Sequence, residues 1–242
     1  MKIDLHVHSR HSSDGVMSIK TIIQTAQKCG LDGVAICDHN VFLAYEEAIR
    51  TAPPGFIVIP GVEYSTDFGH VLALFVTKQY DLEVDARGRR SLAALRVAAK
   101  ADGAILVAAH PFRKRATAPD ELFNTVDGIE VRNSRDAATA PENSQKASAA
   151  AAKFAKFATG GSDAHISSEI GACFTRLPDE TERSLRGVRT ALTKKLSQGG
   201  GAGGALIHQA IGKLRRTRPK TIAKDVTRLV AFAVKDVTKK WR

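Results

Sequence analysis

The sequence predicts an α/β protein made of parallel strand–helix units and followed by a basic helical tail. Two observations lead to this fold class. Seven short apolar runs alternate with longer segments of helical periodicity, and ionisable residues, histidines above all, follow the carboxyl ends of those runs. A chain of 242 residues can bury a full core, and 43% hydrophobic with 25% charged residues is typical of a globular protein.

The apolar runs that predict strands are residues 3–8, 33–37, 56–62, 104–109, 128–131, 157–159 and 173–177. A further apolar run, residues 71–76, has no long helix before it and predicts a hairpin-like return after the third strand. Helical patterns cover residues 18–29, 44–51, 91–101, 137–154 and 180–196. At the first helix, Ser18 is a candidate N-cap before the stripe of Ile19, Ile22, Ile23 and Ala26, and Gly30 is a stop signal.

The excess positive charge lies in the last part of the chain. Residues 194–242 hold 13 Lys and Arg against two acids, whereas the preceding residues hold 23 of each sign, so the net charge of +11 belongs to the tail. The segment "SQGGGAGGA", residues 197–205, predicts a flexible hinge or surface loop. We therefore expect one domain over residues 1–196 and a hinge with an amphipathic helical tail over residues 197–242.

Three interpretations of the tail remain open. Its helix can pack across the barrel with a solvated basic face, residues 213–242 can contact the phosphate backbone of a nucleic acid, or the helix can dock on a membrane surface. No run of 18 apolar residues exists and the chain enters a strand pattern at once, so we expect a cytoplasmic protein without a transmembrane segment. The three cysteines form no CxxC pair, and Cys37 is expected to be a buried small hydrophobe rather than a reactive thiol.

Ionisable residues follow the predicted strands at their carboxyl ends, the face that carries active sites in β/α barrels. On the first strand, alternation puts His6 and His8 on one face, with Asp4 one layer deeper as a possible supporting carboxylate. Seven of the eight histidines lie at or near this face, accompanied by Asp14, Glu63 and Asp163. Imidazole and carboxylate ligands without thiolates favour Zn, Mn or Fe, and nine candidate ligands, His11 not counted, are enough for two or three divalent ions.

Seven motifs, in this order, resemble those of the PHP (polymerase and histidinol phosphatase) superfamily of metal-dependent phosphoesterases. They are "DLHVHSRHSSDG", "AICDHN", "PGVEYS", "GHVLAL", "AHP", "GIEVRN" and "GSDAH", and they span about residues 2–176. The resemblance implies a distorted (βα)7 TIM-like barrel with a trinuclear metal site. This agrees with the strand count above.

Carried over by position, the resemblance implies three ions. The first is held by His6, His8, Glu63 and Asp163, the second shares Glu63 and adds His70 and His110, and the third takes Asp14, His39 and His165. Glu130 is a further ligand or a supporting carboxylate, as Asp4 and Asp38 can be. His11 matches no ligand position and is expected to be a solvated loop residue.

The expected function is hydrolysis of a phosphate ester by a metal-activated water, held at His6, His8, Glu63 and Asp163. The substrate is a small phosphomonoester, a nucleotide or a short oligonucleotide. Two basic clusters can clamp a second phosphate or a carboxylate: Arg113 with Lys114 and Arg115, and Arg132 with Arg135. The alternatives are a PHP-type nuclease or nucleic-acid-binding module and an amidohydrolase, whose bridging carboxylated lysine would correspond here to Glu63.

Overall fold

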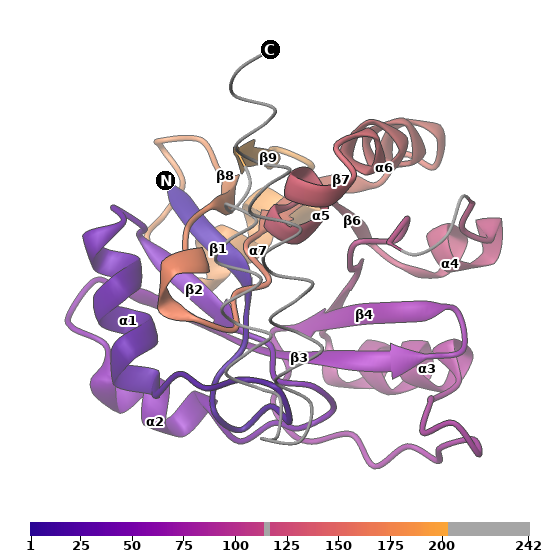
Figure 1. Cartoon of the computed structure of the whole chain (residues 1–242), viewed down its shortest axis with the longest axis horizontal. Helices are drawn as coiled ribbons and strands as arrows, with labels where there is room; N and C mark the ends of the chain where they lie inside the picture. The colour runs from indigo at the N-terminus through magenta and orange to yellow at the C-terminus, as the bar shows by residue number, and fades with distance from the viewer. Residues whose placement is uncertain (114–116, 203–242) are drawn as a thin grey trace, which may run out of the picture.

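In the computed structural model, which describes residues 1–113 and 117–202, nine strands form one curved sheet (Figure 1). Their order across the sheet is β7-β6-β5-β4-β3-β2-β1-β8-β9. The strands are β1 Lys2–Val7, β2 Gly33–Ile36, β3 Ile57–Thr66, β4 Gly69–Leu74, β5 Ile105–Ala108, β6 Gly128–Asn133, β7 Phe157–Gly161, β8 Cys173–Arg176 and β9 Gln198–Gly201. The helices are α1 Ile19–Lys28, α2 Tyr45–Thr51, α3 Leu92–Asp102, α4 Asp120–Thr125, α5 Ser134–Thr139, α6 Glu142–Lys153 and α7 Leu185–Thr193, with a 3-10 turn at Ser167–Glu169.

The two ends of the curved sheet meet at β7, which makes a distorted, nearly closed barrel. Beyond the end of β7, the Asp163 N–H donates to the carbonyl of His6 at 2.7 Å, and the His8 N–H donates to the carbonyl of Ala164 at 2.9 Å. Within β7 itself, Gly160 is joined to β8: the buried Thr175 hydroxyl accepts from the Gly160 N–H and donates to the Gly160 carbonyl, both at 2.9 Å. The predicted barrel is thus confirmed.

The strand directions are more mixed than the predicted set of parallel units. β4 pairs antiparallel with both β3 and β5, as the hairpin-like return requires, and its first residues therefore lie beside the last residues of β3. β8, expected as a parallel strand, is antiparallel to β1. The predicted return at β4 is therefore confirmed, and the prediction of a parallel strand was wrong at β8.

The helices differ from the predicted ranges at Pro141, which divides one helix, and at α4, which is short. The expected helix over residues 137–154 is two helices, because Pro141 has no N–H to donate and restricts the residue before it. The one-and-a-half-turn helix α4 was not predicted. Ser18 caps α1 as expected, with its side chain accepting from the Thr21 N–H.

The Gly-rich segment begins with a strand, not a hinge. β9 pairs antiparallel with β8, with Gly200 opposite Phe174 and Gly201 opposite Cys173. A side chain at Gly199 would come within 2.8 Å of the Thr159 carbonyl oxygen, so the bare backbone allows β9 to pack closely on β7. The predicted tail helix, including residues 213–242, lies outside the described residues.

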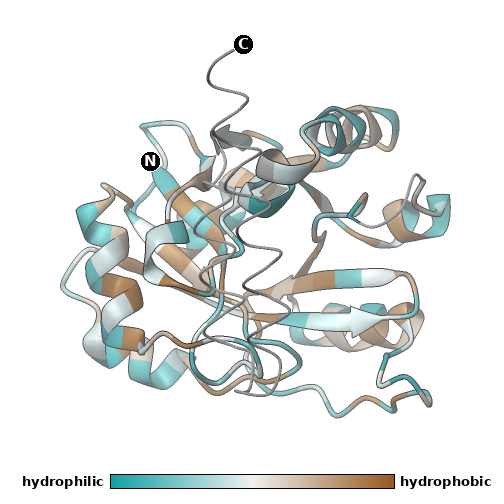
Figure 2. Ribbon diagram, viewed as in Figure 1, coloured by the Kyte–Doolittle hydropathy of each residue, from teal (hydrophilic) through white to brown (hydrophobic). Residues whose placement is uncertain are grey.

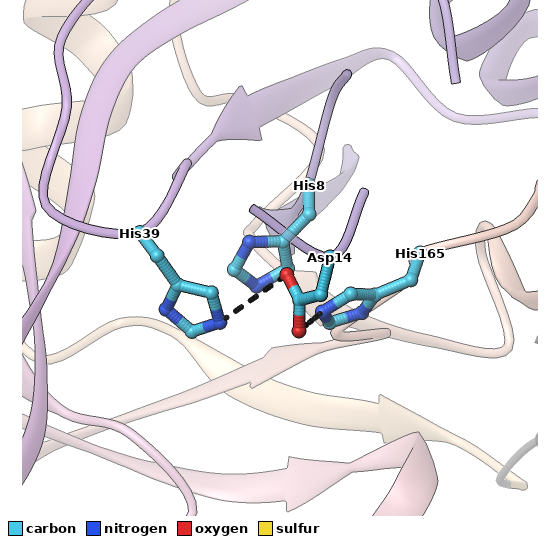
Figure 3. Close-up of side chains that lie close together, drawn as sticks. All are labelled: His8, Asp14, His39 and His165. Carbon is cyan, nitrogen blue, oxygen red and sulfur yellow. Dashed lines mark hydrogen bonds and ion pairs between the residues drawn. The ribbon is translucent and has the colours of Figure 1, made fainter. Parts of the chain in front are cut away.

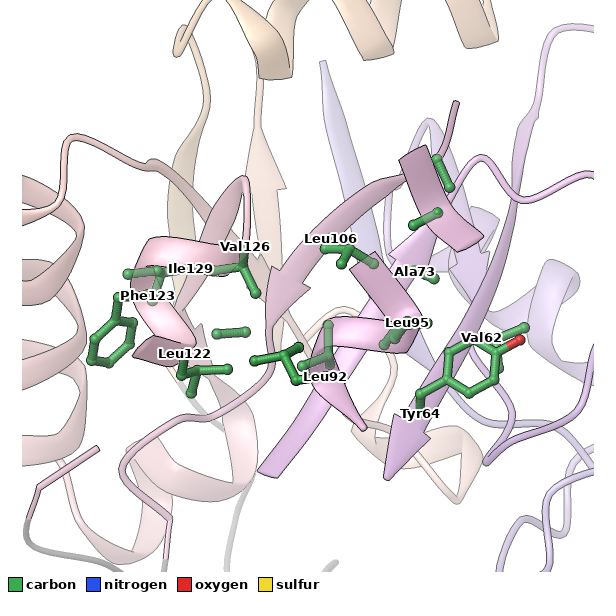
Figure 4. Close-up of a cluster of buried hydrophobic side chains, with 14 of the residues drawn as sticks. Val62, Tyr64, Ala73, Leu92, Leu95, Leu106, Leu122, Phe123, Val126 and Ile129 are labelled. Carbon is green, nitrogen blue, oxygen red and sulfur yellow. The ribbon is translucent and has the colours of Figure 1, made fainter. Parts of the chain in front are cut away.

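Apolar side chains form layers on both faces of the sheet. One cluster packs β3, β4, β5 and β6 against α3, α4 and α6 (Figure 4). A second lies between α1, α2 and the neighbouring strands, and Figure 2 shows the apolar stripe of α1 turned toward the sheet. A third packs β1 to β5 and β7 against α7 and includes Ile57 and Ile59 of β3. The face of β3 that holds these two continues to Glu63, so this cluster forms the floor beneath Glu63.

Within the described residues, no helix has both the length and the apolar character that a membrane span needs. Cys37 is buried, as expected, and Cys173 is buried too, whereas Cys29 is exposed.

Replacing Thr175 by valine tests the barrel closure. The variant keeps the shape of the side chain but leaves the buried Gly160 backbone without either hydrogen bond. We expect the free energy of unfolding to fall by roughly 2–6 kcal/mol, at 1–3 kcal/mol for each of the two unsatisfied groups. Urea unfolding measures it. The control Thr193→Val alters an exposed helical threonine and is expected to change stability by at most about 0.5 kcal/mol. Equal urea midpoints for the two variants would contradict the role of Thr175 in closing the barrel.

Candidate metal centre

All nine predicted ligands lie at one end of the barrel, where β1, β2, β3, β5 and β7 finish and β4 begins. The described residues contain four groups of His, Asp and Glu side chains whose ligand atoms lie within 4.8 Å of one another. These groups are His8, Asp14, His39 and His165; His6, His110 and Asp163; His6, His8 and Glu63; and His39, Glu63 and His70. Because the groups share members, they form one continuous cluster.

The carboxylate of Glu63 lies at the centre of this cluster and its side chain is only 1% exposed. Oε1 is 2.9 Å from His70 Nδ1 and 3.0 Å from His110 Nε2. Oε2 is buried and makes no hydrogen bond. Three imidazole nitrogens nevertheless surround Oε2, at 3.1 Å for His39 Nδ1, 3.2 Å for His8 Nε2 and 3.3 Å for His6 Nε2.

Asp163 is a second carboxylate of the cluster and lies beside His6 and His8. Its Oδ1 lies 3.3 Å from His8 Nε2 and 3.8 Å from His6 Nε2. The two histidine Nε2 atoms are themselves only 3.1 Å apart. The four residues expected to hold the first ion, His6, His8, Glu63 and Asp163, therefore point their ligand atoms at one another.

Asp14 connects two further histidines at the open side of the cluster (Figure 3). Its Oδ2 is 3.0 Å from His165 Nε2, and its Oδ1 is 3.6 Å from His39 Nε2. The structure thus brings together the three residues expected at the third ion and adds His8 to them. The second expected set, Glu63 with His70 and His110, shares Glu63 Oε1 as described above.

The three carboxylates considered as supporting groups have separate roles. Glu130 Oε1 lies 3.0 Å from His6 Nδ1, and its Oε2 accepts from the His110 N–H and from the Asn133 side chain, both at 2.9 Å. Both of its oxygens are occupied by protein groups, so the geometry favours the supporting role over that of a ligand. Asp38 accepts from the N–H and the hydroxyl of Ser9, both at 2.6 Å, and fixes the loop after β1.

The fully buried Asp4 binds backbone groups through its carboxylate. The pairing of β1 with β2 shifts register between Asp4 and Val7. Asp4 accepts from the backbone N–H groups of His6, Ser162 and Gly171, so it holds β1, β7 and β8 together from outside the ligand cluster.

The electrostatics suit a cation. Burial would raise the pKa of Glu63, but the charges and hydrogen bonds of nearby histidines, His6 first, hold that pKa well below its ordinary value. Burial would lower the pKa of His8, yet the nearby carboxylates of Asp163 and Glu63 raise it to about 9. Ionised carboxylates therefore draw positive charge into a buried space, a charge that metal ions would supply.

Two other histidines remain neutral. Burial and the charge of Arg113 lower the pKa of His110 to about 3, and burial together with His8 lowers that of His165 to about 4. Neutral imidazole is the form that binds metals.

Two residues of the cluster adopt unusual backbone conformations. His110 and Asp163 have φ angles of 31° and 55°, in the region that favours glycine. Such conformations cost of order 1–3 kcal/mol each and concentrate at functional sites. The chain thus turns sharply at the ends of β5 and β7, where these side chains are aimed into the cluster.

The three predicted phosphate-binding arginines are all engaged by the protein itself. Arg113 donates to Asp136, Asn133 and Asp163 at 2.6–2.7 Å, so it fixes a predicted ligand. Arg132 donates to the Gly201 carbonyl of β9, and Arg135 pairs with Glu169 at 3.0 Å. Lys114 and Arg115 lie outside the described residues. His11 is in none of the ligand groups, as expected, and lies 3.8 Å from Glu47.

The sequence did not predict two residues that contact the candidate ligands and their supporting groups, Ser12 and Asn133. The Ser12 hydroxyl lies 3.3 Å from His8 Nδ1, accepts from the His39 N–H at 3.1 Å and donates to Asp14 at 3.2 Å. Asn133 contacts Glu130, and its side-chain oxygen accepts from Arg113. Both stand inside the quoted motifs, but hydroxyl and amide side chains are too common in loops to single out by pattern.

Comparison with known proteins gives the same family as the motifs. The protein-family model described as "PHP domain" matches residues 4–96, and the family model described as "PHP-associated" matches residues 141–195. An uncharacterized protein of Methanocaldococcus jannaschii is 30% identical over 188 residues, which cover 74% of this chain and 71% of that protein. A 5'-3' exoribonuclease of Haemophilus influenzae is 40% identical over 68 residues, 28% of this chain and 24% of that enzyme.

The fold has relatives among solved structures. A two-domain protein of Bacteroides vulgatus, which contains a predicted PHP-like metal-dependent phosphoesterase, superimposes with a TM-score of 0.69 at 22% identity. The match covers 84% of this chain and 65% of that larger one, so this chain spans less than two thirds of its length. Matching family models, a relative that is 30% identical over most of both chains, and the shared fold agree: the chain belongs to the PHP domain family.

Proposed function

We propose that the protein hydrolyses a phosphate ester by means of a water activated by two or three divalent ions, Mn, Zn or Fe. The observation that carries this proposal is Glu63 Oε2, a buried anionic oxygen without a hydrogen bond and with three imidazole nitrogens within 3.3 Å. A buried charged oxygen without a hydrogen bond is costly, and a cation held between it and those nitrogens would remove the cost.

The side chains present fit such ions. All nine candidate donors are imidazole nitrogens or carboxylate oxygens, which suits Zn, Mn and Fe. We assign His6, His8, Glu63 and Asp163 to the first ion, Glu63, His70 and His110 to the second, and Asp14, His39 and His165 to the third. Glu130 would fix the ring of His6 through Nδ1 and so direct Nε2 toward the first ion.

Bound ions would lower the pKa of a coordinated water to about 7 and stabilise the charge that develops on the phosphoryl oxygens. The protein's own groups hold that arrangement still. Arg113 keeps Asp163 oriented through Nη1 at 2.7 Å, and the apolar floor of Ile57 and Ile59 keeps bulk water away from Glu63. Three carboxylates against up to six positive charges leave a net positive site for a phosphate.

A nuclease is the second candidate. One relative is a 5'-3' exoribonuclease, and residues 213–242 carry a run of Lys and Arg that can bind a polyanion. A chain truncated after Ala202, which keeps β9, separates the two functions. If the tail recruits nucleic acid, truncation weakens cleavage of oligonucleotides and leaves cleavage of small esters unchanged.

Activity tests use phosphate monoesters, cyclic diesters and short oligonucleotides, with the protein loaded in turn with Mn, Zn or Fe. His8→Ala is expected to lower phosphate release by roughly a hundredfold or more, beyond the 10–100-fold typical of losing a supporting partner. His11→Ala is the matched control, because it removes a histidine of the same loop that lies outside the ligand groups. Equal rates for both variants, or no hydrolysis with any metal, would end the proposal.

Thermal unfolding gives a test that needs no substrate. A ligand at a hundred times its Kd stabilises the folded state by about 2.7 kcal/mol, so adding Mn to chelator-treated protein is expected to raise Tm by several degrees. Glu63→Gln is expected to abolish most of this increase, and Glu46→Gln, whose side chain is 85% exposed, to keep it. A full increase in the Glu63 variant would show that the ions bind elsewhere.

Glu130→Gln tests the supporting role of that carboxylate. We expect metal affinity to fall by about 10–100-fold, because the His6 ring loses the acceptor that orients it. Isothermal titration with Mn measures the affinity, and Glu142→Gln on the exposed side of α6 is the control. Complete loss of binding would instead make Glu130 a ligand.

A further inference from the structure

A cavity of about 460 Å³ adjoins the metal centre. His70 and His110, both hydrogen-bonded to Glu63, line it together with Arg87 and Arg89 from the connection between β4 and α3. Volumes of roughly 300–1,000 Å³ are typical of small-molecule sites. The cavity therefore has room for the leaving group of an ester beside the place where the phosphate would meet the metals.

The two arginines project from a tight turn of defined shape. The Asp85 N–H donates to the Arg89 carbonyl and the Gly88 N–H donates to the Asp85 carbonyl, both at 2.8 Å. The Asp85 carboxylate accepts from the N–H groups of Arg87 and Arg89 at 2.8 and 2.9 Å. Gly88 has a φ of 72°, which the turn requires and which glycine adopts without strain. The backbone that carries the arginines is thus preorganised.

The base of this turn is tied to the strand that bears Glu63. The Arg90 N–H donates to the Ser65 carbonyl at 2.9 Å, and the Asp67 N–H donates to the Arg90 carbonyl at 3.0 Å. The Arg90 side chain also donates to Asn40 Oδ1 at 2.7 Å, next to His39. The turn therefore keeps a fixed position relative to the metal centre.

Charge is available at the tip of the turn. Across residues 1–113 and 117–202, the Arg87 guanidinium has no hydrogen-bond or ion-pair partner, in contrast to the fully engaged Arg113. Arg89 pairs with Asp85 at 2.7 Å, but both side chains are about 40% exposed, and such pairs contribute little and exchange readily. A guanidinium binds phosphate or carboxylate oxygens with two parallel hydrogen bonds.

We propose that the substrate is a phosphate ester whose leaving group carries a second anion, a phosphate or a carboxylate, and that Arg87 binds this anion in the cavity with Arg89 beside it. The proposal rests on the proposed function, because the metal centre must hold the first phosphate. Arg87 takes the place of Arg113, Arg132 and Arg135, the residues expected from the sequence to bind a second anion, since all three are bound to other parts of the protein.

Direct binding tests the proposal without turnover. Alkane diphosphonates and phosphonocarboxylates of increasing chain length are titrated into the Mn-loaded full chain and compared with the matching alkyl monophosphonates. We expect one of the two series to bind about tenfold more tightly than the monophosphonates, the scale of a charge-assisted hydrogen bond. Whichever series does so identifies the second anion.

Arg87→Ala is expected to remove this advantage and leave monophosphonate binding unchanged, and Arg87→Lys to keep part of it. Arg186→Ala, an 83% exposed arginine outside the cavity, is the control and is expected to keep it all. If neither series binds more tightly than the monophosphonates, or if the Arg87 and Arg186 variants behave alike, the proposal fails even when small esters are hydrolysed. If second-anion binding holds and no ester is hydrolysed, only the proposed function fails.

Discussion

The burial of one carboxylate, that of Glu63, constrains the rest of the site. Five imidazole nitrogens lie within 3.3 Å of its two oxygens, and one oxygen still makes no hydrogen bond. When His6 donates its Nδ1 proton to Glu130, its Nε2 presents a lone pair to the carboxylate. Lone pairs and a negative oxygen repel one another unless a cation lies between them. A metal ion in that place would supply the positive charge, and the imidazole and carboxylate donors are able to hold one.

The fold explains how so many donors reach one point. β3 runs on beyond the floor of apolar residues to Glu63, and the antiparallel β4 returns at once with His70 beside it. On the other side, backbone hydrogen bonds from Asp163 to β1 and from His8 to the segment after β7 close the barrel at the level of the ligands. The proposed metal binding and the barrel closure depend on the same few residues, so the strained backbone at Asp163 is compensated by the contacts it creates.

Much of the ligand cluster could be predicted from the sequence. Alternation on a strand placed His6 and His8 together, and the convergence of strand ends predicted that Glu63 and Asp163 would join them. His70 depended on the family resemblance, because only the antiparallel return brings the start of a strand to this face.

Other features depend on tertiary contacts that no local pattern encodes. The register shift of β1 between Asp4 and Val7 shows up only in the pairing of β1 with β2. The glycines of β9 have no strand pattern, and they pair because β8 offers an edge and β7 allows close approach. Composition alone also could not separate Arg113, which fixes Asp163, from Arg87, which lines the cavity beside the cluster.

Anomalous diffraction from crystals of the Mn-loaded protein tests the central claim most directly. Two or three anomalous peaks are expected inside the cluster, one of them bonded to Glu63 Oε2 at about 2.0–2.2 Å, the usual length for a carboxylate ligand. Well-ordered crystals with full Mn loading and no peak within reach of Glu63 would contradict the account.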